Sequence, residues 1–139
     1  MEINDTRKNM KETEKHKGGV WHQGDKEFYY HWYSGLIHEK QTNYDSAQHY
    51  YHKALAVRRH EMGTYYVKYP LGRVLFLSGD TLNGRKYINQ YIAEVTYEIN
   101  HPDEQEWSMI AETVKAYRHE IKEAIYFLER RKANNVTNQ

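Results

Sequence analysis

The sequence predicts an all-α protein in which two helical hairpins are followed by one long C-terminal helix. Three observations support this fold class. Apolar residues recur every three or four positions from 103 to 132, and no helix breaker interrupts them. Short polar or glycine-containing breaks, such as 41–43 and 78–80, separate the earlier segments. Between these breaks, small and aromatic residues follow one another at helical spacing, as in Tyr44, Ala47, Tyr51 and Ala54.

The first hairpin is expected over 26–61. Its first helix runs over 26–40 behind Asp25 as N-cap, and its second runs over 43–61, where Thr42 or Asn43 caps it and Gly63 ends it.

The second hairpin is expected over 64–99. Its first helix, 64–78, contains Pro70, so either the helix bends there or its regular part begins at the proline. Its second helix, 81–99, follows a fresh cap in 78–80 and is broken by Asn100, His101 and Pro102.

Composition indicates one domain with a tyrosine-rich core. We expect a frayed charged arm at 1–19, a single helical domain at 20–132 and a polar tail at 133–139. Cysteine is absent, which excludes disulfides and thiolate chemistry and agrees with a cytoplasmic location. No apolar run reaches the length of a membrane span, and a net charge of +1 argues against a dedicated nucleic-acid binder.

The helix expected at 26–40 is apolar almost all round, which predicts a cover on two sides. One cover is the helix at 43–61, and the other is the segment Val20-Trp21, a partner chain or a ligand. The apolar positions are Phe28, Tyr29, Tyr30, Trp32, Tyr33, Leu36 and Ile37.

The run from Phe28 to Val57 resembles a tetratricopeptide repeat, a helix-turn-helix unit of about 34 residues. Gly35 falls at the small position of the first helix, and the second helix carries the small and aromatic pattern already described. A weaker second copy spans 65–98, with Gly72, Gly84 and Ile88 at matching positions. It departs from the family pattern at Thr81, where an aromatic residue is usual, and at Tyr91, where alanine is usual.

The spacing of 37 residues between Gly35 and Gly72 predicts that the second helix is about one turn longer than standard. The resemblance implies a right-handed superhelical fragment that binds a protein or peptide in a concave groove lined by the first helix of each hairpin. The groove positions would be Tyr29, Trp32, Leu36, Glu39, Tyr66, Tyr69, Arg73 and Phe76.

Arg73 is the sharpest candidate, because a cation on an otherwise apolar helix needs a partner, for example a ligand carboxylate. For Trp32 and Tyr29 the alternative is cover by this chain's own Trp21 segment or last helix.

The segment 28–54 is also similar to the first repeat of the Rap-type aspartate phosphatases, bacterial regulators that bind short signalling peptides. This similarity implies a regulatory peptide sensor as an alternative function. The chain is too short for their complete repeat array, so their activity is not carried over.

The last helix, 103–132, is expected to cap the repeats. Because it is about twice as long as a repeat helix, its distal half, 121–128, should lie at the opposite end of the domain or on another subunit. A homodimer through this stripe is the resulting hypothesis.

Catalytic and metal motifs are absent, which indicates a protein that is not an enzyme and needs no cofactor. The histidine pairs His49/His52 and His31/His38 lack the further ligands of a zinc site, and solvated histidines on polar faces are expected instead. The basic clusters 58–60 and 130–132 complement helix C-termini. They leave nucleic-acid association as a minor alternative.

Overall fold

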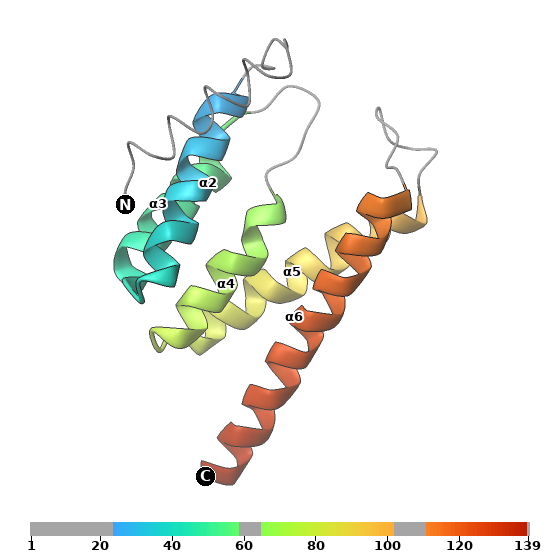
Figure 1. The fold of residues 1–139 in the computed structure, drawn as a ribbon. Helices are drawn as coiled ribbons and strands as arrows, with labels where there is room; N and C mark the ends of the chain where they lie inside the picture. Colours follow the sequence, from blue (N-terminus) through green and yellow to red (C-terminus); the bar gives the residue numbers. More distant parts are fainter. Residues whose placement is uncertain (1–23, 59–64, 102–110, 139) are drawn as a thin grey trace.

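The computed structural model describes residues 24–58, 65–101 and 111–138 (Figure 1). The predictions that concern the arm 1–19, Val20-Trp21, Gly63 and the segment 102–110 lie outside the described residues. Within these ranges the chain forms α2 (Asp25–Lys40), α3 (Tyr44–Ala56), η1 (Tyr65–Val67), α4 (Lys68–Leu77), α5 (Thr81–Asn100) and α6 (Ala111–Asn138). The described residues include no strand, so the prediction of an all-α fold is confirmed.

Helix α2 begins at Asp25, and the N-cap position is taken by Gly24 in the left-handed region, with φ of 83°. The prediction that Asp25 is the N-cap is therefore wrong. A Cβ on Gly24 would lie 2.0 Å from the backbone oxygen of Arg58, so only glycine fits where the start of α2 meets the end of the α3 segment. Asp25 itself is buried in the first turn.

Helix α3 ends earlier than its sequence pattern predicts. Its last residue is Ala56, and Val57 is extended with ψ of 136°. The predicted bounds of 43–61, and with them the extra helical turn, are wrong. The additional residues of the 37-residue spacing fall in the connection between α3 and α4.

Helix α4 contains Pro70 as its third residue, directly after the 3-10 turn η1. The first turn of a helix has no intrahelical acceptors for its N–H groups, so proline costs no hydrogen bond there. The regular helix thus starts close to the proline, as one of the two alternatives predicted. Asp80 caps α5 by accepting a hydrogen bond from the Asn83 backbone N–H at 3.2 Å, which confirms the expected cap.

In each hairpin the two helices approach each other closely at a glycine of the first helix. A Cβ on Gly35 would lie 2.5 Å from ring atoms of Tyr51, and a Cβ on Gly72 would lie 2.5 Å from Cγ1 of Ile88. The two pairs have the same separation along the chain, and so the α2–α3 and α4–α5 hairpins share one internal register. Gly84 completes the second crossing, because its Cβ would lie 2.7 Å from the backbone oxygen of Gly72.

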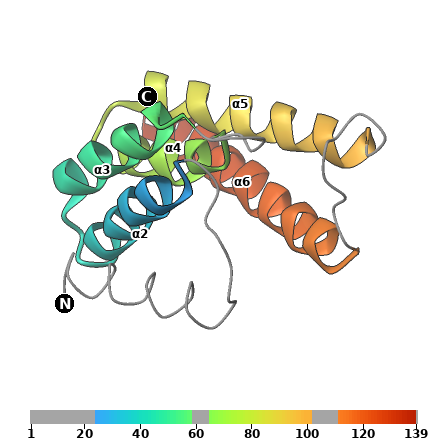
Figure 2. The ribbon, with the colours of Figure 1, turned by 90° about the horizontal axis from the view of Figure 1, so that it is seen from above.

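The two hairpins meet through α3 and α4. Figure 2 shows α3 and α5 on one side of α4, and α2 with the N-terminal half of α6 on the other. Two apolar cores result. The first joins the α2–α3 hairpin to α4 and contains Phe28, Ala47, Tyr51, Ala54, Val67, Leu71, Val74 and Leu75. The second joins α4, α5 and α6.

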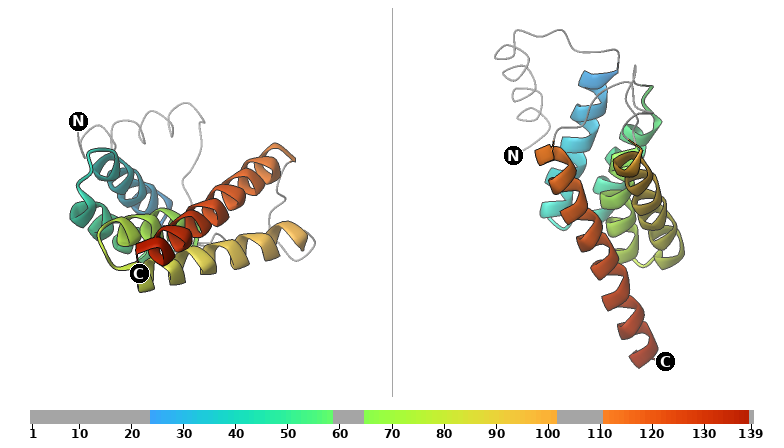
Figure 3. Two further views of the ribbon diagram at one scale, coloured as in Figure 1. Left: turned by 90° about the horizontal axis from the view of Figure 1, so that it is seen from below. Right: turned by 90° about the vertical axis from the view of Figure 1, so that its right-hand side faces the viewer.

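Helix α6 runs obliquely across α4 and α5 (Figure 3). Ala124, Phe127 and Leu128 are buried in the second core of the same chain. Of the two predicted places for the distal half, another subunit is not the one in the structure: this half packs on its own chain, with Phe127 against Phe76 near the end of α4. Ala124 and Leu128 of the stripe are buried within the chain, whereas Ile125 is exposed, and the homodimer through this stripe stays a prediction. The helix also continues beyond 132, through Asn138.

Candidate functional site

Helix α2 carries three stacked rings and a leucine one turn further along, which together we call the α2 aromatic strip (Tyr29, Trp32, Tyr33 and Leu36). The ring centroids of Tyr29 and Trp32 are 5.9 Å apart, those of Tyr29 and Tyr33 are 5.6 Å apart, and both pairs are stacked. Residues three and four apart share a helix face, so the sequence spacing alone brings these rings together. Tyr33 remains 39% exposed, the largest value in the strip.

Trp32 links the strip to the interior. It packs against both apolar cores, and its ring lies 5.4 Å from that of Phe28. Its indole N–H is buried and has no hydrogen-bond acceptor in the part of the chain that the structure describes. Burial also raises the pKa of the neighbouring Tyr33 hydroxyl, and Tyr29 adds to this effect. The α2 aromatic strip is thus buried against the two cores at Trp32 and exposed to solvent at Tyr33.

The aromatic positions of the second hairpin lie deeper than predicted. Tyr66, Tyr69 and Phe76 are all buried in the core that α6 completes. Tyr66 stacks on Tyr117 of α6 at 4.9 Å, and Phe76 meets Phe127 edge to face at 5.6 Å. The chain's own last helix covers these three rings. A partner reaches these rings only if α6 moves.

Arg73 finds its partner within the chain. Its Nε and Nη2 donate to the two carboxylate oxygens of Glu39 at 2.5 and 2.8 Å, a bidentate pair between α4 and α2. Burial by itself lowers the pKa of Arg73, but the hydrogen bonds and the charge of Glu39 outweigh it and raise that pKa. The sequence placed both residues on the same predicted groove; the structure shows that they pair with each other.

A continuous chain of polar and aromatic contacts extends this pair across the five α-helices of the described residues. The Tyr51 hydroxyl of α3 donates to Glu39 at 2.7 Å. The Arg73 guanidinium lies 4.8 Å from the ring centroid of Tyr69, and Tyr69 stacks on Tyr91 at 5.5 Å. The Tyr91 hydroxyl then donates to Glu120 of α6 at 2.6 Å.

Sequence reasoning missed Tyr91 and Glu120 as contact residues. The signal was present in Tyr91, which stands where the repeat pattern has alanine. A buried tyrosine at a position for a methyl group must direct its hydroxyl to an acceptor, here on the last helix. The Tyr66 hydroxyl likewise donates to a carboxylate, that of Glu98, at 2.6 Å. Burial raises the pKa of this Glu98 carboxyl.

The histidines of α2 are not solvated as predicted. The side chain of His31 is 12% exposed, and both His31 and His38 stack on Tyr50 of α3, the latter at 5.4 Å. Both histidines lie at the interface between α2 and α3, because the side of α2 that faces α3 is apolar as well. His119, with a side chain 75% exposed, fits the prediction. Within the described residues no three metal-ligating side chains gather.

The described members of the two basic clusters have different surroundings. Arg58 and Arg130 are exposed, whereas the guanidinium of Arg131 lies 3.6 Å from the ring centroid of Phe127. Arg131 therefore covers the end of the second core. None of the helices in the described ranges is long and apolar enough to cross a membrane.

Comparison with known proteins gives no match: no protein-family model, curated protein or solved structure corresponds to this chain. The likeness to tetratricopeptide repeats and to Rap-type regulators therefore stays a prediction based on residues.

Proposed function

We propose that this chain is a non-catalytic adaptor of the tetratricopeptide-repeat type, which binds a protein or peptide through the face of α2 and α4. In this arrangement the α2 aromatic strip is the part of the site open to a partner. The proposal includes a cytoplasmic location, for which the absence of cysteine is the argument.

The observation that carries the proposal is the packing of the strip. Three rings are held in stacked positions on a regular helix, so they lose little conformational entropy when a ligand covers them. Aromatic anchors of this kind dominate the binding energy of protein interfaces. The repeated glycine register of the two hairpins supports the repeat type of the fold.

No specific observation favours the peptide-sensor or the nucleic-acid alternative. The Rap-like segment is the same α2–α3 hairpin that the adaptor proposal uses. Of the basic residues, Arg73 and Arg131 are engaged in contacts within the chain.

The test compares the full chain with a Tyr33→Ala variant. Immobilised protein is exposed to a lysate of the source cells, the retained proteins are quantified by mass spectrometry, and the strongest is purified for calorimetry. Tyr33 is exposed enough to be replaced without opening a core. We expect the Tyr33→Ala substitution to raise the dissociation constant of the partner by about tenfold, as truncation of an aromatic contact does.

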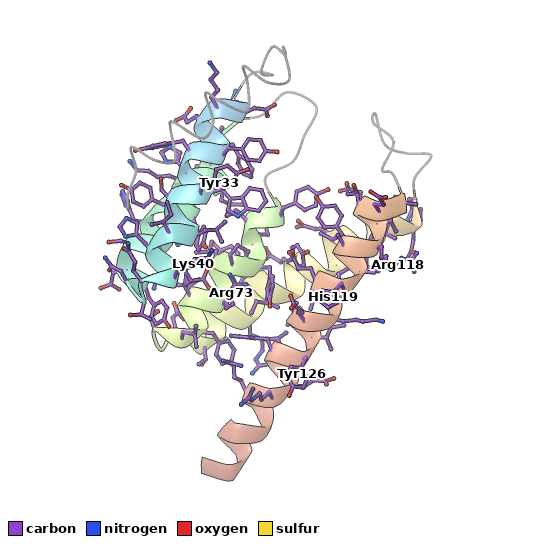
Figure 4. The ribbon with its side chains drawn as sticks, viewed as in Figure 1. Tyr33, Lys40, Arg73, Arg118, His119 and Tyr126 are labelled. Carbon is purple, nitrogen blue, oxygen red and sulfur yellow. The ribbon has the colours of Figure 1, made fainter. Side chains whose placement is uncertain are left out.

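Tyr126→Ala is the matched control, since Tyr126 is 63% exposed on α6, away from the strip (Figure 4). Equal retention of every partner by wild type and Tyr33→Ala would refute the strip as the site.

A further inference from the structure

We propose that Arg85 and Arg131 form a second binding site, which takes the carboxylate groups of an acidic segment of a partner protein. Each guanidinium lies over a phenylalanine ring, and we call the four residues the arginine–phenylalanine cluster (Phe76, Arg85, Phe127 and Arg131). The inference goes beyond the proposed function, because the cluster includes no residue of the α2 aromatic strip.

The arginine–phenylalanine cluster joins three helices. Phe76 of α4 and Phe127 of α6 are both buried and meet edge to face, with their ring centroids 5.6 Å apart. The guanidinium of Arg85 on α5 lies 5.4 Å from the centroid of Phe76, and that of Arg131 on α6 lies 3.6 Å from the centroid of Phe127. Because the two rings belong to the second core, they hold both guanidiniums at its edge.

Neither guanidinium has an acid beside it. Within 24–58, 65–101 and 111–138, no carboxylate pairs with Arg85 or Arg131, whereas Arg73 has the bidentate contact with Glu39. The two cations of the cluster are therefore still available to an anion from outside the described residues.

The acids that are near in sequence do not change this. Both oxygens of Asp80 accept hydrogen bonds from Asn83, one from its backbone N–H at 3.2 Å and one from its Nδ2 at 2.8 Å. Glu129 precedes Arg131 by two residues, and side chains two residues apart in a helix do not face each other.

The electrostatics of Arg131 are the reverse of those of Arg73. Burial lowers the pKa of the Arg131 guanidinium, the charge of Arg130 lowers it further, and the Tyr69 hydroxyl opposes both effects. The contact with Glu39 instead raises the pKa of Arg73. A carboxylate bound to Arg131 would offset the cost of a partly buried cation in the way that Glu39 does for Arg73.

A stacked guanidinium is well prepared to bind a carboxylate. The ring covers one flat side of the guanidinium and leaves the N–H groups at its edge available. These groups form a planar fork that matches the two oxygens of a carboxylate. Because the ring already fixes the arginine side chain, less conformational entropy is lost when the ligand binds.

Exposed apolar side chains lie near the cations. Leu82, which is 80% exposed, precedes Arg85 by three residues, so the two share a face of α5. Leu77, at the end of α4, directly follows Phe76 and is 41% exposed. A Cβ on Gly79 would meet nothing within 4 Å, so the turn between α4 and α5 is open. This surface favours a ligand that carries acidic and apolar residues together.

That ligand is an acidic protein segment rather than a nucleic acid. Nucleic-acid binding depends on many cations that neutralise successive phosphates. The cluster offers two guanidiniums with leucines nearby, on a chain whose net charge is +1. Leucine side chains gain nothing from a phosphate backbone, whereas they pack against apolar side chains of a peptide.

The experiment uses the full chain, labelled with ¹⁵N, and the acetylated, amidated peptide Glu-Leu-Glu-Glu-Leu as the probe. A matched neutral probe has glutamine in place of each glutamate. NMR titration at about 50 mM salt, where screening is weak, measures both dissociation constants. We expect the Nε–Hε signals of Arg85 and Arg131 to move with the acidic probe, and the neutral probe to bind at least about tenfold more weakly.

Arg85→Gln and Arg131→Gln should each weaken the acidic probe by about tenfold, since each removes a charge-assisted contact. Arg118→Gln is the matched control. It removes the same charge from an exposed site on α6, about 20 Å from Arg131 along the helix (Figure 4). It should change the affinity by less than about twofold, as a distant exposed charge does. Circular dichroism checks the fold of every variant, and if one arginine variant does not fold, the other carries the comparison.

Equal affinity for the two probes, wild-type affinity in the folded arginine variants, or an equal loss in Arg118→Gln would overturn the inference. An oligothymidylate that binds more tightly than the acidic probe, and that loses affinity in both arginine variants, would assign the cluster to nucleic acid and overturn it too. Tyr33→Ala should bind the acidic probe like wild type, so failure here is distinguishable from failure of the proposed function.

Discussion

At the scale of single residues, this fold depends on where a few buried polar groups find partners. The sequence indicates that Arg73 needs one, since it stands on an apolar helix. It does not indicate which of the 19 acidic residues is near enough. The structure selects Glu39, which also accepts from Tyr51. Removal of Glu39 would take away the buried carboxylate to which both Arg73 of α4 and Tyr51 of α3 donate.

The histidine at the α2–α3 interface makes stability depend on pH. Burial lowers the pKa of His31; the charge of Glu27 opposes this, and Lys53 and His49 add to it. The folded-state pKa is therefore below the unfolded value of about 6.5, and the unfolded chain binds more protons when the pH falls past that value. Stability from this group is complete above pH 6.5 and is lost as the pH falls toward the folded pKa.

We expect a His31→Gln variant to lose less stability than wild type between pH 7 and pH 5, as measured by urea unfolding at each pH. His52, whose pKa is also lowered by burial, contributes in the same direction, so the loss is reduced and not abolished. His119→Gln is the control, because its side chain is 75% exposed. Identical pH profiles for His31→Gln and wild type would contradict the assignment.

At the scale of helices, glycines set how closely the partners of each hairpin approach. The sequence identifies Gly35, Gly72 and Gly84 from their place in the repeat pattern, and the structure puts each of them at a contact that a Cβ would obstruct. Helix boundaries were predicted less well. The pattern of α3 continues past Ala56, but Val57 is extended and the next residue, Arg58, lies against Gly24 at the start of α2.

Gly72→Ala tests the helix crossing. In an unobstructed helix this change would stabilise by about 1 kcal/mol through propensity. Here the added Cβ would lie 2.7 Å from the backbone oxygen of Gly84, which cannot rotate away. We expect a net loss of about 1–3 kcal/mol in the free energy of unfolding, measured with urea. Asn89→Ala, an exposed site on α5, should change it by less than about 0.5 kcal/mol, and a stabilised Gly72→Ala would rule out the close crossing.

At the scale of the whole molecule, α4 and α5 hold the structure together. Helix α4 contributes to both cores, and α5 contacts α4 on one side and α6 on the other. Helix α6 belongs to one core only and has exposed apolar residues on its outer side. Local stability should therefore be uneven along the chain.

Native-state hydrogen exchange should show this difference. We expect the slowest amides around Gly72 in α4 and Ile88 in α5, and at least about tenfold faster exchange in α6, because α6 can leave without opening the first core. Mass spectrometry of peptides from each helix measures the rates. Equal protection of α5 and α6 would mean that α6 opens only with the whole domain.

The sequence by itself determined the helices, their hairpin pairing and the small positions at which they cross. These features follow from local spacing, which repeats every three or four residues and can be recognised without knowing the fold. Tertiary structure alone decided the partner of Arg73, the burial of Tyr66, Tyr69 and Phe76, and the place of α6. Those features depend on contacts between residues far apart in the chain, such as Phe76 with Phe127. An amphipathic stripe predicts that one face of a helix is buried, but it does not indicate which other segment buries it.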